Sequence, residues 1–153
     1  MIRFKGFSLV ELITVVAIIG ILASLTYPSF NNYTQNQELK NSAKELLSNL
    51  KLAQQYTVTE QAKYSVAINL MSGSYSLIKK GDPDQTIQSF SLDEDVYFSS
   101  ANGIQDSEAV FNPTGAVDYS GEVFLTHQQS ERLVKVTIKP SGYVNWEYYE
   151  EEE

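Results

Sequence analysis

Cysteine is absent from this chain of 153 residues, and histidine occurs once, as His127. Without cysteine there can be no disulfide, no thiol catalysis and no cysteine-based zinc site. A single histidine leaves at most one candidate for a Ser-His-Asp triad or a histidine-based metal site. His127 ends a predicted strand beside two glutamines, and we expect it to face solvent. The sequence therefore predicts a non-enzymatic protein without metal or cofactor, held together by packing.

Positive charge is also scarce. Lys and Arg number 11 against 19 Asp and Glu, which gives a formal net charge of −8. Such a chain repels phosphate backbones and anionic lipid surfaces unless its few cations cluster on one face. Nucleic acid is therefore not expected as a partner. The length is that of one ordinary domain.

The chain begins with a long apolar run over residues 7–27 that contains one acid, Glu11. About 20 apolar residues can span a membrane as a helix, and Arg3 and Lys5 before the run favour a cytoplasmic N-terminus. We therefore predict a membrane helix over 7–28, single-pass in the inner (cytoplasmic) membrane, with the C-terminal domain in the periplasm or outside. A cleaved signal peptide and a plain anchor leave Glu11 without a role, and a buried core helix is rarely apolar on all faces.

A resemblance accounts for the acid. The stretch KGFSLVELITVVAIIGILA resembles the class III leader and N-terminal helix of type IV pilins and of the pseudopilins of type II secretion. The resemblance implies that residues 1–6 are a cleaved leader, that a prepilin peptidase cuts between Gly6 and Phe7, and that the new amine of Phe7 is N-methylated. It also implies a helix kink at Pro28, where many members of the family bend.

Cleavage would give Glu11 a partner. In a helical stack of subunits its carboxylate can pair with the amine of Phe7 on a neighbour, and at about 4 Å with an effective dielectric of about 20 the attraction is roughly 4 kcal/mol. One buried pair of this kind sets the register of an otherwise featureless apolar rod. The implied partners are other pilin or pseudopilin subunits, the prepilin peptidase, an inner-membrane assembly platform and membrane lipid, and the assembled subunit would be filament-associated.

The polar stretch 29–60 is predicted to continue the helix as an amphipathic segment, because apolar residues recur in it at spacings of three and four. These residues are Leu39, Ala43, Leu46, Leu47, Leu50 and Ala53. Residues 61–146 alternate as short strands do, beginning with a hairpin over 63–80. The sequence thus predicts an α+β fold, a long N-terminal helix packed on an antiparallel β-sheet or β-sandwich. The acidic segment 147–153 is predicted to be a frayed tail, or else a docking strip for a basic surface.

The last third of the chain carries a second resemblance. Phe111, Pro113, Gly115 and Gly142 occupy the places of an F-x-P-x-G stretch and a final glycine turn in the GspH/FimT branch of minor pilins and minor pseudopilins. The resemblance implies a structural minor subunit of a type IV pilus or a type II secretion pseudopilus. A FimT-like DNA-binding minor pilin and a major pilin are the alternatives. DNA-binding members carry arginines after the final glycine turn, whereas residues 143–149 are aromatic and acidic here.

Acidic residues in 81–85 and 93–95 form another candidate site. Asp82 and Asp84 could offer oxygens to calcium, which some pseudopilins bind through a loop. The spacing is not that of an EF-hand, and Pro83 supplies no side-chain ligand. A solvated acidic loop is the preferred interpretation.

Overall fold

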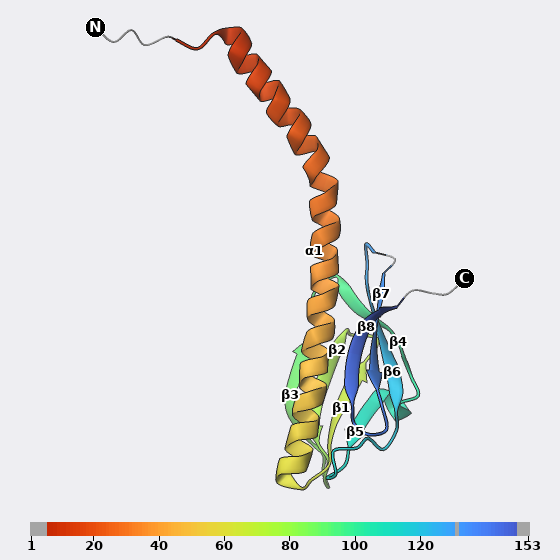
Figure 1. The fold of residues 1–153 in the computed structure, drawn as a ribbon. Helices are drawn as coiled ribbons and strands as arrows, with labels where there is room; N and C mark the ends of the chain where they lie inside the picture. Colours follow the sequence, from red (N-terminus) through yellow and green to blue (C-terminus); the bar gives the residue numbers. More distant parts are fainter. Residues whose placement is uncertain (1–5, 131, 150–153) are drawn as a thin grey trace. The chain divides into compact units, whose positions relative to one another are not determined.

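The computed structural model describes residues 6–130 and 132–149. The chain divides into two compact units, Met1–Thr34 and Gln35–Glu153. One helix, α1 (Leu9–Glu60, 52 residues), begins in the first unit and ends in the second (Figure 1). After its last turn, Gln61 takes the left-handed conformation with a φ of 52°, which is a common way for a helix to end.

The other elements of the second unit are short. They are β1 (Tyr64–Asn69), β2 (Ser74–Lys79), β3 (Gln85–Ser91), β4 (Val96–Asn102), the 3-10 turn η1 (Gln105–Ser107), β5 (Glu108–Phe111), β6 (Gly121–His127), β7 (Leu133–Ile138) and β8 (Val144–Tyr149). The strands form two antiparallel sheets, with the orders β3-β2-β1-β5 and β4-β6-β7-β8 (Figure 1). The predicted α+β fold, with a helix on antiparallel sheets, is confirmed.

The strands follow the predicted alternation, with one difference at the end of the chain. The hairpin predicted over 63–80 is β1 paired with β2. Residues 147–149, predicted as the start of the acidic tail, instead belong to β8, where Tyr149 pairs with Leu133. Aromatic residues favour strands, and Glu147 is neutralised by Lys135 at 3.0 Å across the ladder. Residues 150–153 of the predicted tail lie outside the described residues.

Within the second unit, α1 buries one apolar stripe against the strands. Its fully buried residues are Leu39, Ala43, Leu46, Leu50 and Ala53, as the spacing of three and four predicts. Leu47, at the margin of the stripe, is only partly buried. The strands complete the core with Val66, Leu77, Phe98, Ala109, Phe111, Val123, Leu125, Val134, Val136 and Ile138. Helix and both sheets therefore share one hydrophobic core.

A polar contact lies inside this core. Asn49 Nδ2 on α1 donates to the hydroxyl oxygen of Tyr75 on β2 at 2.9 Å. The Tyr75 ring stacks on Phe90 at 5.1 Å and meets the edge of Phe98 at 6.3 Å. Because the phenolate would be desolvated there, burial raises the pKa of Tyr75 to about 12.

The raised pKa of Tyr75 predicts a loss of stability at high pH. The folded state holds the phenol proton more tightly than the unfolded state, whose tyrosine pKa is about 10. The contribution is complete below about pH 10 and is lost as the pH rises towards 12. We expect about 2–3 kcal/mol of the free energy of unfolding to disappear across this window. Denaturant titrations of the full chain in detergent measure it.

Tyr75→Phe is the comparison for this titration, because it keeps the ring and cannot ionise. Its free energy of unfolding should be lower at neutral pH, where Asn49 loses its acceptor, and should fall less steeply above about pH 10. Equal slopes for the two proteins would show that other groups, such as lysines, cause the alkaline transition.

Candidate functional site

The predicted cleavage site lies just before α1. Gly6, Phe7 and Ser8 precede the helix, and Phe7 is 74% exposed. No heavy atom lies within 4 Å of the position that a Cβ on Gly6 would occupy. The first described helical hydrogen bond runs from the Leu12 N–H to the Ser8 carbonyl at 3.1 Å. The peptide bond between Gly6 and Phe7 is therefore accessible in the isolated chain, while residues 1–5 of the predicted leader lie outside the described residues.

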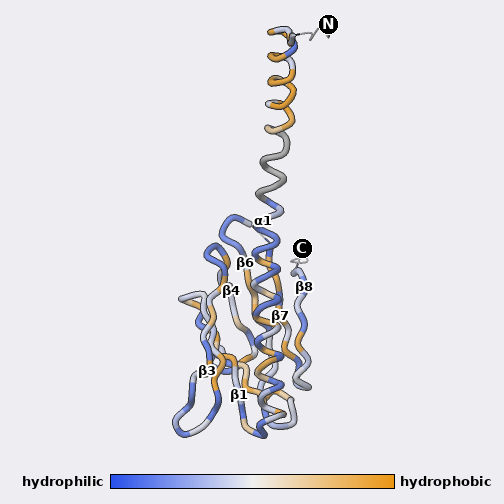
Figure 2. The backbone as a smooth tube through the Cα atoms, turned by 90° about the vertical axis from the view of Figure 1, so that its left-hand side faces the viewer, coloured by the Kyte–Doolittle hydropathy of each residue, from blue (hydrophilic) through white to orange (hydrophobic). Residues whose placement is uncertain are grey.

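The described start of α1 is mostly hydrophobic over successive turns (Figure 2), and its large apolar side chains are exposed. The exposed residues are Leu9, Val10, Leu12, Ile13, Val15, Val16, Ile18, Ile19, Ile21 and Leu22. A helix on the surface of a globular protein buries one apolar face and keeps the other polar, so this segment needs an apolar environment outside the chain. Among the residues that the structure describes, no helix is sufficiently long and apolar to span a membrane.

Glu11 interrupts this apolar surface. It is exposed and lies in the first turn of α1, where the helix dipole favours a carboxylate. It forms no hydrogen bond or ion pair with any described residue, so the carboxylate is available to a group on another molecule. The predicted pairing with the amine of Phe7 on a neighbouring subunit stays a prediction.

Pro28 lies inside α1, and the helix continues on both sides of it. Proline removes one backbone hydrogen bond and crowds the preceding turn, which commonly bends a helix. The side chains of residues 25–31 are outside those that the structure describes. The kink predicted at Pro28 therefore stays a prediction.

Two predicted motif residues meet in the second unit. Gly115 and Gly142 have φ values of +83° and +79°, in the left-handed region that favours glycine. Gln54 Nε2 on α1 donates to the Gly115 carbonyl at 2.6 Å. A Cβ on Gly142 would overlap both the Gly115 carbonyl oxygen and the Gln54 amide. We call Gln54, Gly115 and Gly142 the glycine junction. At this junction two turns pack against α1 and against each other, so closely that position 142 has room only for glycine.

The other two motif residues shape the approach to this junction. Phe111 is fully buried at the end of β5, and Pro113 lies in the turn that follows. The Gly115 N–H closes this turn on the Asn112 carbonyl at 2.7 Å. The motif therefore serves packing and chain direction rather than chemistry. Sequence reasoning missed Gln54, because one glutamine on the half-buried flank of a helix carries no distinguishing signal.

The prediction for His127 is wrong. Its side chain is only 1% exposed, and its Nε2 lies 3.0 Å from Glu38 Oε2 on α1. Its Nδ1 accepts a hydrogen bond from the Gln129 N–H at 3.1 Å. The end of β6 is covered by α1, so a residue that would face solvent in an isolated sheet is buried. Both ring nitrogens have partners, as buried polar groups require.

His127, Glu38 and Asp95 form a candidate metal centre, since each offers a ligand atom and these atoms lie within 4.8 Å of one another. The hydrogen bonds argue against a metal. Because Nδ1 accepts from the Gln129 N–H, a neutral ring carries its proton on Nε2 and donates it to Glu38. A metal on Nε2 would need that proton on Nδ1, pointing at another N–H. The cluster fits a hydrogen-bonded link between α1 and β6.

Two of the acidic residues considered as calcium ligands, Asp84 and Asp93, have protein partners. Asp84 forms an ion pair with Lys80 and accepts the Gly81 N–H at 2.9 Å. The hydrogen bond from Lys80, followed by that from Gly81, lowers the pKa of Asp84. Asp93 Oδ2 accepts from the Ser42 hydroxyl on α1 at 3.0 Å. These carboxylates hold separate elements in place, in agreement with a structural use of the acidic loops.

The start of the chain matches a known family model. Residues 1–27 match the model described as the prokaryotic N-terminal methylation motif. A fimbrial protein of Pseudomonas aeruginosa is 43% identical over 56 residues, which are 37% of this chain and 36% of that protein. The type IV major pilin protein PilA of Myxococcus xanthus is 43% identical over 63 residues, 41% of this chain and 28% of PilA. The chain thus spans about a third of the length of these curated relatives.

Solved structures share the fold. The minor pseudopilin EpsH from the type 2 secretion system of Vibrio cholerae superimposes with a TM-score of 0.62, over 71% of this chain and 95% of EpsH, at 17% identity. The type IV minor pilin FimU of Pseudomonas aeruginosa gives a TM-score of 0.60, over 75% of this chain and 92% of FimU, at 14% identity. The chain thus begins with the N-terminal methylation motif and has the fold of these pilin and pseudopilin structures. At these identities, the likeness to EpsH and FimU shows the fold alone.

The two findings concern different parts of the chain. The methylation motif includes Gly6, Phe7 and Glu11 at the exposed start of the chain. The likeness to solved structures extends over most of the chain and concerns the packing of helix and sheets. Pilins and pseudopilins are structural subunits rather than enzymes.

Proposed function

We propose that this protein is a structural minor subunit of the GspH/FimT branch, which inserts in the inner membrane and assembles into a type IV pilus or a type II secretion pseudopilus. The observation that carries the proposal is the apolar surface of α1 over residues 9–24, exposed in the isolated chain and interrupted by Glu11. The methylation motif and the pilin-like fold support it.

Membrane insertion would come first. Residues 7–28 would stand in the lipid with the C-terminal domain outside the cytoplasm, and the prepilin peptidase would remove residues 1–6. Assembly would then replace lipid by the apolar helices of other subunits. Since lipid and helices are equally apolar, van der Waals packing and the pairing of Glu11 with the Phe7 amine of a neighbour would supply the specificity.

Processing gives the direct test of the proposal. The mature protein, isolated from membranes of cells that contain a prepilin peptidase, should begin at Phe7 and carry one N-methyl group by mass spectrometry. Gly6→Val should slow cleavage, because a branched Cβ hinders close approach of a protease to the backbone. Gly20→Ala is the matched control, since Gly20 lies in the same apolar segment with open space around it. A mature protein that keeps Met1, or begins well beyond Phe7, contradicts the proposal.

A major pilin is the second candidate. It is favoured by the curated relatives, which include the type IV major pilin PilA, although the match to PilA covers only 41% of this chain. Counting subunits in purified filaments separates the two. Many copies along the shaft indicate a major pilin, and rare copies indicate a minor one.

A further inference from the structure

Several lysine and arginine side chains of this acidic protein form no ion pair with a described carboxylate. Lys63, Lys79, Lys80 and Lys135 pair with carboxylates. The cations without a carboxylate partner among the described residues are Lys40, Lys44, Lys51, Arg132 and Lys139. In a chain with a net charge of −8, unpaired cations that gather in one place form a local reversal of charge.

Three of these cations share one flank of α1. Lys40, Lys44 and Lys51 are spaced by four and seven residues, which places them within about 40° of one another around the helix. Glu38 and Glu45 lie roughly opposite, at about 140–160° from Lys40. The helix that covers the core therefore has one basic flank and one acidic flank. The acidic flank is partly used by the protein, since Glu38 contacts His127.

The basic flank borders the turn between β7 and β8. A pocket of about 440 Å³ is lined by Lys51 and Gln54 from α1 and by Ser141, Gly142, Tyr143 and Val144 from that turn. Lys139 Nζ lies 5.5 Å from the centre of the Tyr143 ring. Lys51 and Tyr143 therefore line the same opening, Lys139 contacts the Tyr143 ring, and Tyr143 is 55% exposed.

Strand β8 extends this border along the helix. From Val144, beside Lys51, β8 runs in the direction opposite to α1 (Figure 1). Its residues up to Tyr149 cover about 16 Å, the length of about 11 residues of α-helix. The end of β8 therefore lies near the level of Lys40 on α1.

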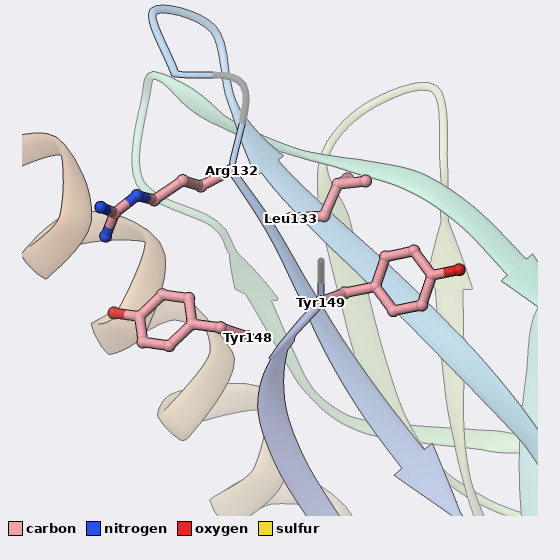
Figure 3. Close-up of a pocket in the computed structure, with 4 residues that line it drawn as sticks. All are labelled: Arg132, Leu133, Tyr148 and Tyr149. Carbon is pink, nitrogen blue, oxygen red and sulfur yellow. The ribbon is translucent and has the colours of Figure 1, made fainter. Parts of the chain in front are cut away.

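A further cation, Arg132, lies near that end of β8, beside Tyr148. Tyr148 pairs with Val134, which is fully buried, so both side chains lie on the core side of the sheet. Figure 3 shows Arg132 and Tyr148 pointing to the side of α1, while Leu133 and Tyr149 point to the other side. We call Lys40, Lys44, Lys51, Arg132 and Lys139, with Tyr143 and Tyr148, the basic strip.

We propose that the basic strip is a docking surface for an acidic, extended protein segment of a neighbouring subunit, an inference that rests on the proposed function as a filament subunit. Strand β8 is the edge of its sheet, so its outward N–H and C=O groups are open to another strand. The lysines of α1 would face the acidic side chains of that strand. The exposed tyrosines would contact the methylene groups of those side chains.

The surroundings favour a short peptide over nucleic acid. Beyond the strip the surface is acidic, since Glu38 and Glu45 lie on the opposite flank of α1 and the chain has a net charge of −8. A nucleic acid carries a phosphate at every residue and would meet these carboxylates as it continued past the strip. A peptide can place its acids on the strip alone and can also use the open strand edge. The segment 144–153 of this chain has such a composition, aromatic and acidic in alternation and then acidic.

The test uses the full chain in detergent micelles and a fluorescein-labelled peptide with the sequence of residues 144–153. Fluorescence anisotropy should show binding at about 50 mM salt that weakens at about 300 mM, because exposed charge pairs are screened. The double variant Lys44→Gln/Lys51→Gln should bind at least about fivefold more weakly. The double variant Lys63→Gln/Lys79→Gln, which removes the same charge outside the strip, should bind as the unsubstituted chain does.

Altered probes identify the occupant. A peptide with every Glu replaced by Gln should lose binding, and one with alternate backbone amides methylated should weaken, since it cannot extend the sheet. Equal binding by the Lys44→Gln/Lys51→Gln variant, or tighter binding of a single-stranded oligonucleotide, would overturn the proposal. Stronger binding by a chain ending at Tyr149 would assign the strip to the chain's own tail. No filament is needed, so failure here leaves the subunit proposal intact.

Discussion

Replacing Gly142 with alanine is expected to lower the free energy of unfolding by at least about 3 kcal/mol. Two effects add. Alanine is strained at a φ of +79°, and its Cβ would occupy the space of the Gly115 carbonyl oxygen and the Gln54 amide. The obstacle is largely backbone, so it cannot move aside without separating a turn from the helix. Denaturant unfolding of the full chain in detergent, followed by the fluorescence of Trp146, the only tryptophan, measures the loss.

Gly73→Ala is the matched control for this experiment. Gly73 also has a positive φ, +61°, but the nearest atom to its hypothetical Cβ is the Val96 carbonyl oxygen at 3.8 Å, an ordinary contact. This variant should lose only about 1 kcal/mol, the conformational part of the effect. If Gly142→Ala lost no more than Gly73→Ala, the glycine junction would not be the close contact that its geometry indicates.

Replacing Glu11 with alanine is expected to leave the protein in the membrane fraction and to remove it from filaments. Alanine makes the segment more apolar, so insertion should be unimpaired. Assembly should fail because the amine of a neighbouring Phe7 would enter the apolar filament core without a counter-charge. A loss of only about 1.4 kcal/mol per contact already reduces incorporation tenfold. Immunoblots of sheared filaments against membrane fractions measure the ratio.

Thr14→Ala is the control for the Glu11 substitution. Thr14 is a polar, exposed residue of the same helical segment, and its hydroxyl donates only to the Val10 carbonyl of its own helix at 2.8 Å. Its removal should not change filament incorporation. Normal entry of the Glu11→Ala subunit into filaments would show that the carboxylate does not direct assembly.

The elements of the fold could be predicted where one periodic pattern acts alone. Leu39, Leu46 and Leu50 recur at helical spacing and are fully buried, and the hairpin of β1 and β2 follows from alternation around a turn. The end of β8 was missed because a run of glutamates suggests a frayed tail. That inference rested on the repulsion of like charges at a chain end, whereas Lys135 on the adjacent strand neutralises Glu147.

In the candidate site, too, local motifs could be predicted from the sequence, whereas contacts between residues far apart in the chain could not. Gly6, Phe7 and Glu11 belong to a local motif and could be named from the sequence. His127 could not be placed, because its burial depends on Glu38, which is far from it in the chain and comes into contact only when α1 covers the end of β6. The basic strip was also not predicted, since Lys51 and Tyr143 come together only through the turn at Gly142.

The side-chain hydrogen bonds of α1 to the strand domain have a mechanical consequence. Glu38, Ser42, Asn49 and Gln54 each bond to a different part of that domain. A tensile force directed along the helix axis would shear these bonds simultaneously rather than peel them one after another. The force at rupture would then be distributed over several hydrogen bonds, which suits the proposed role of the protein as a filament subunit.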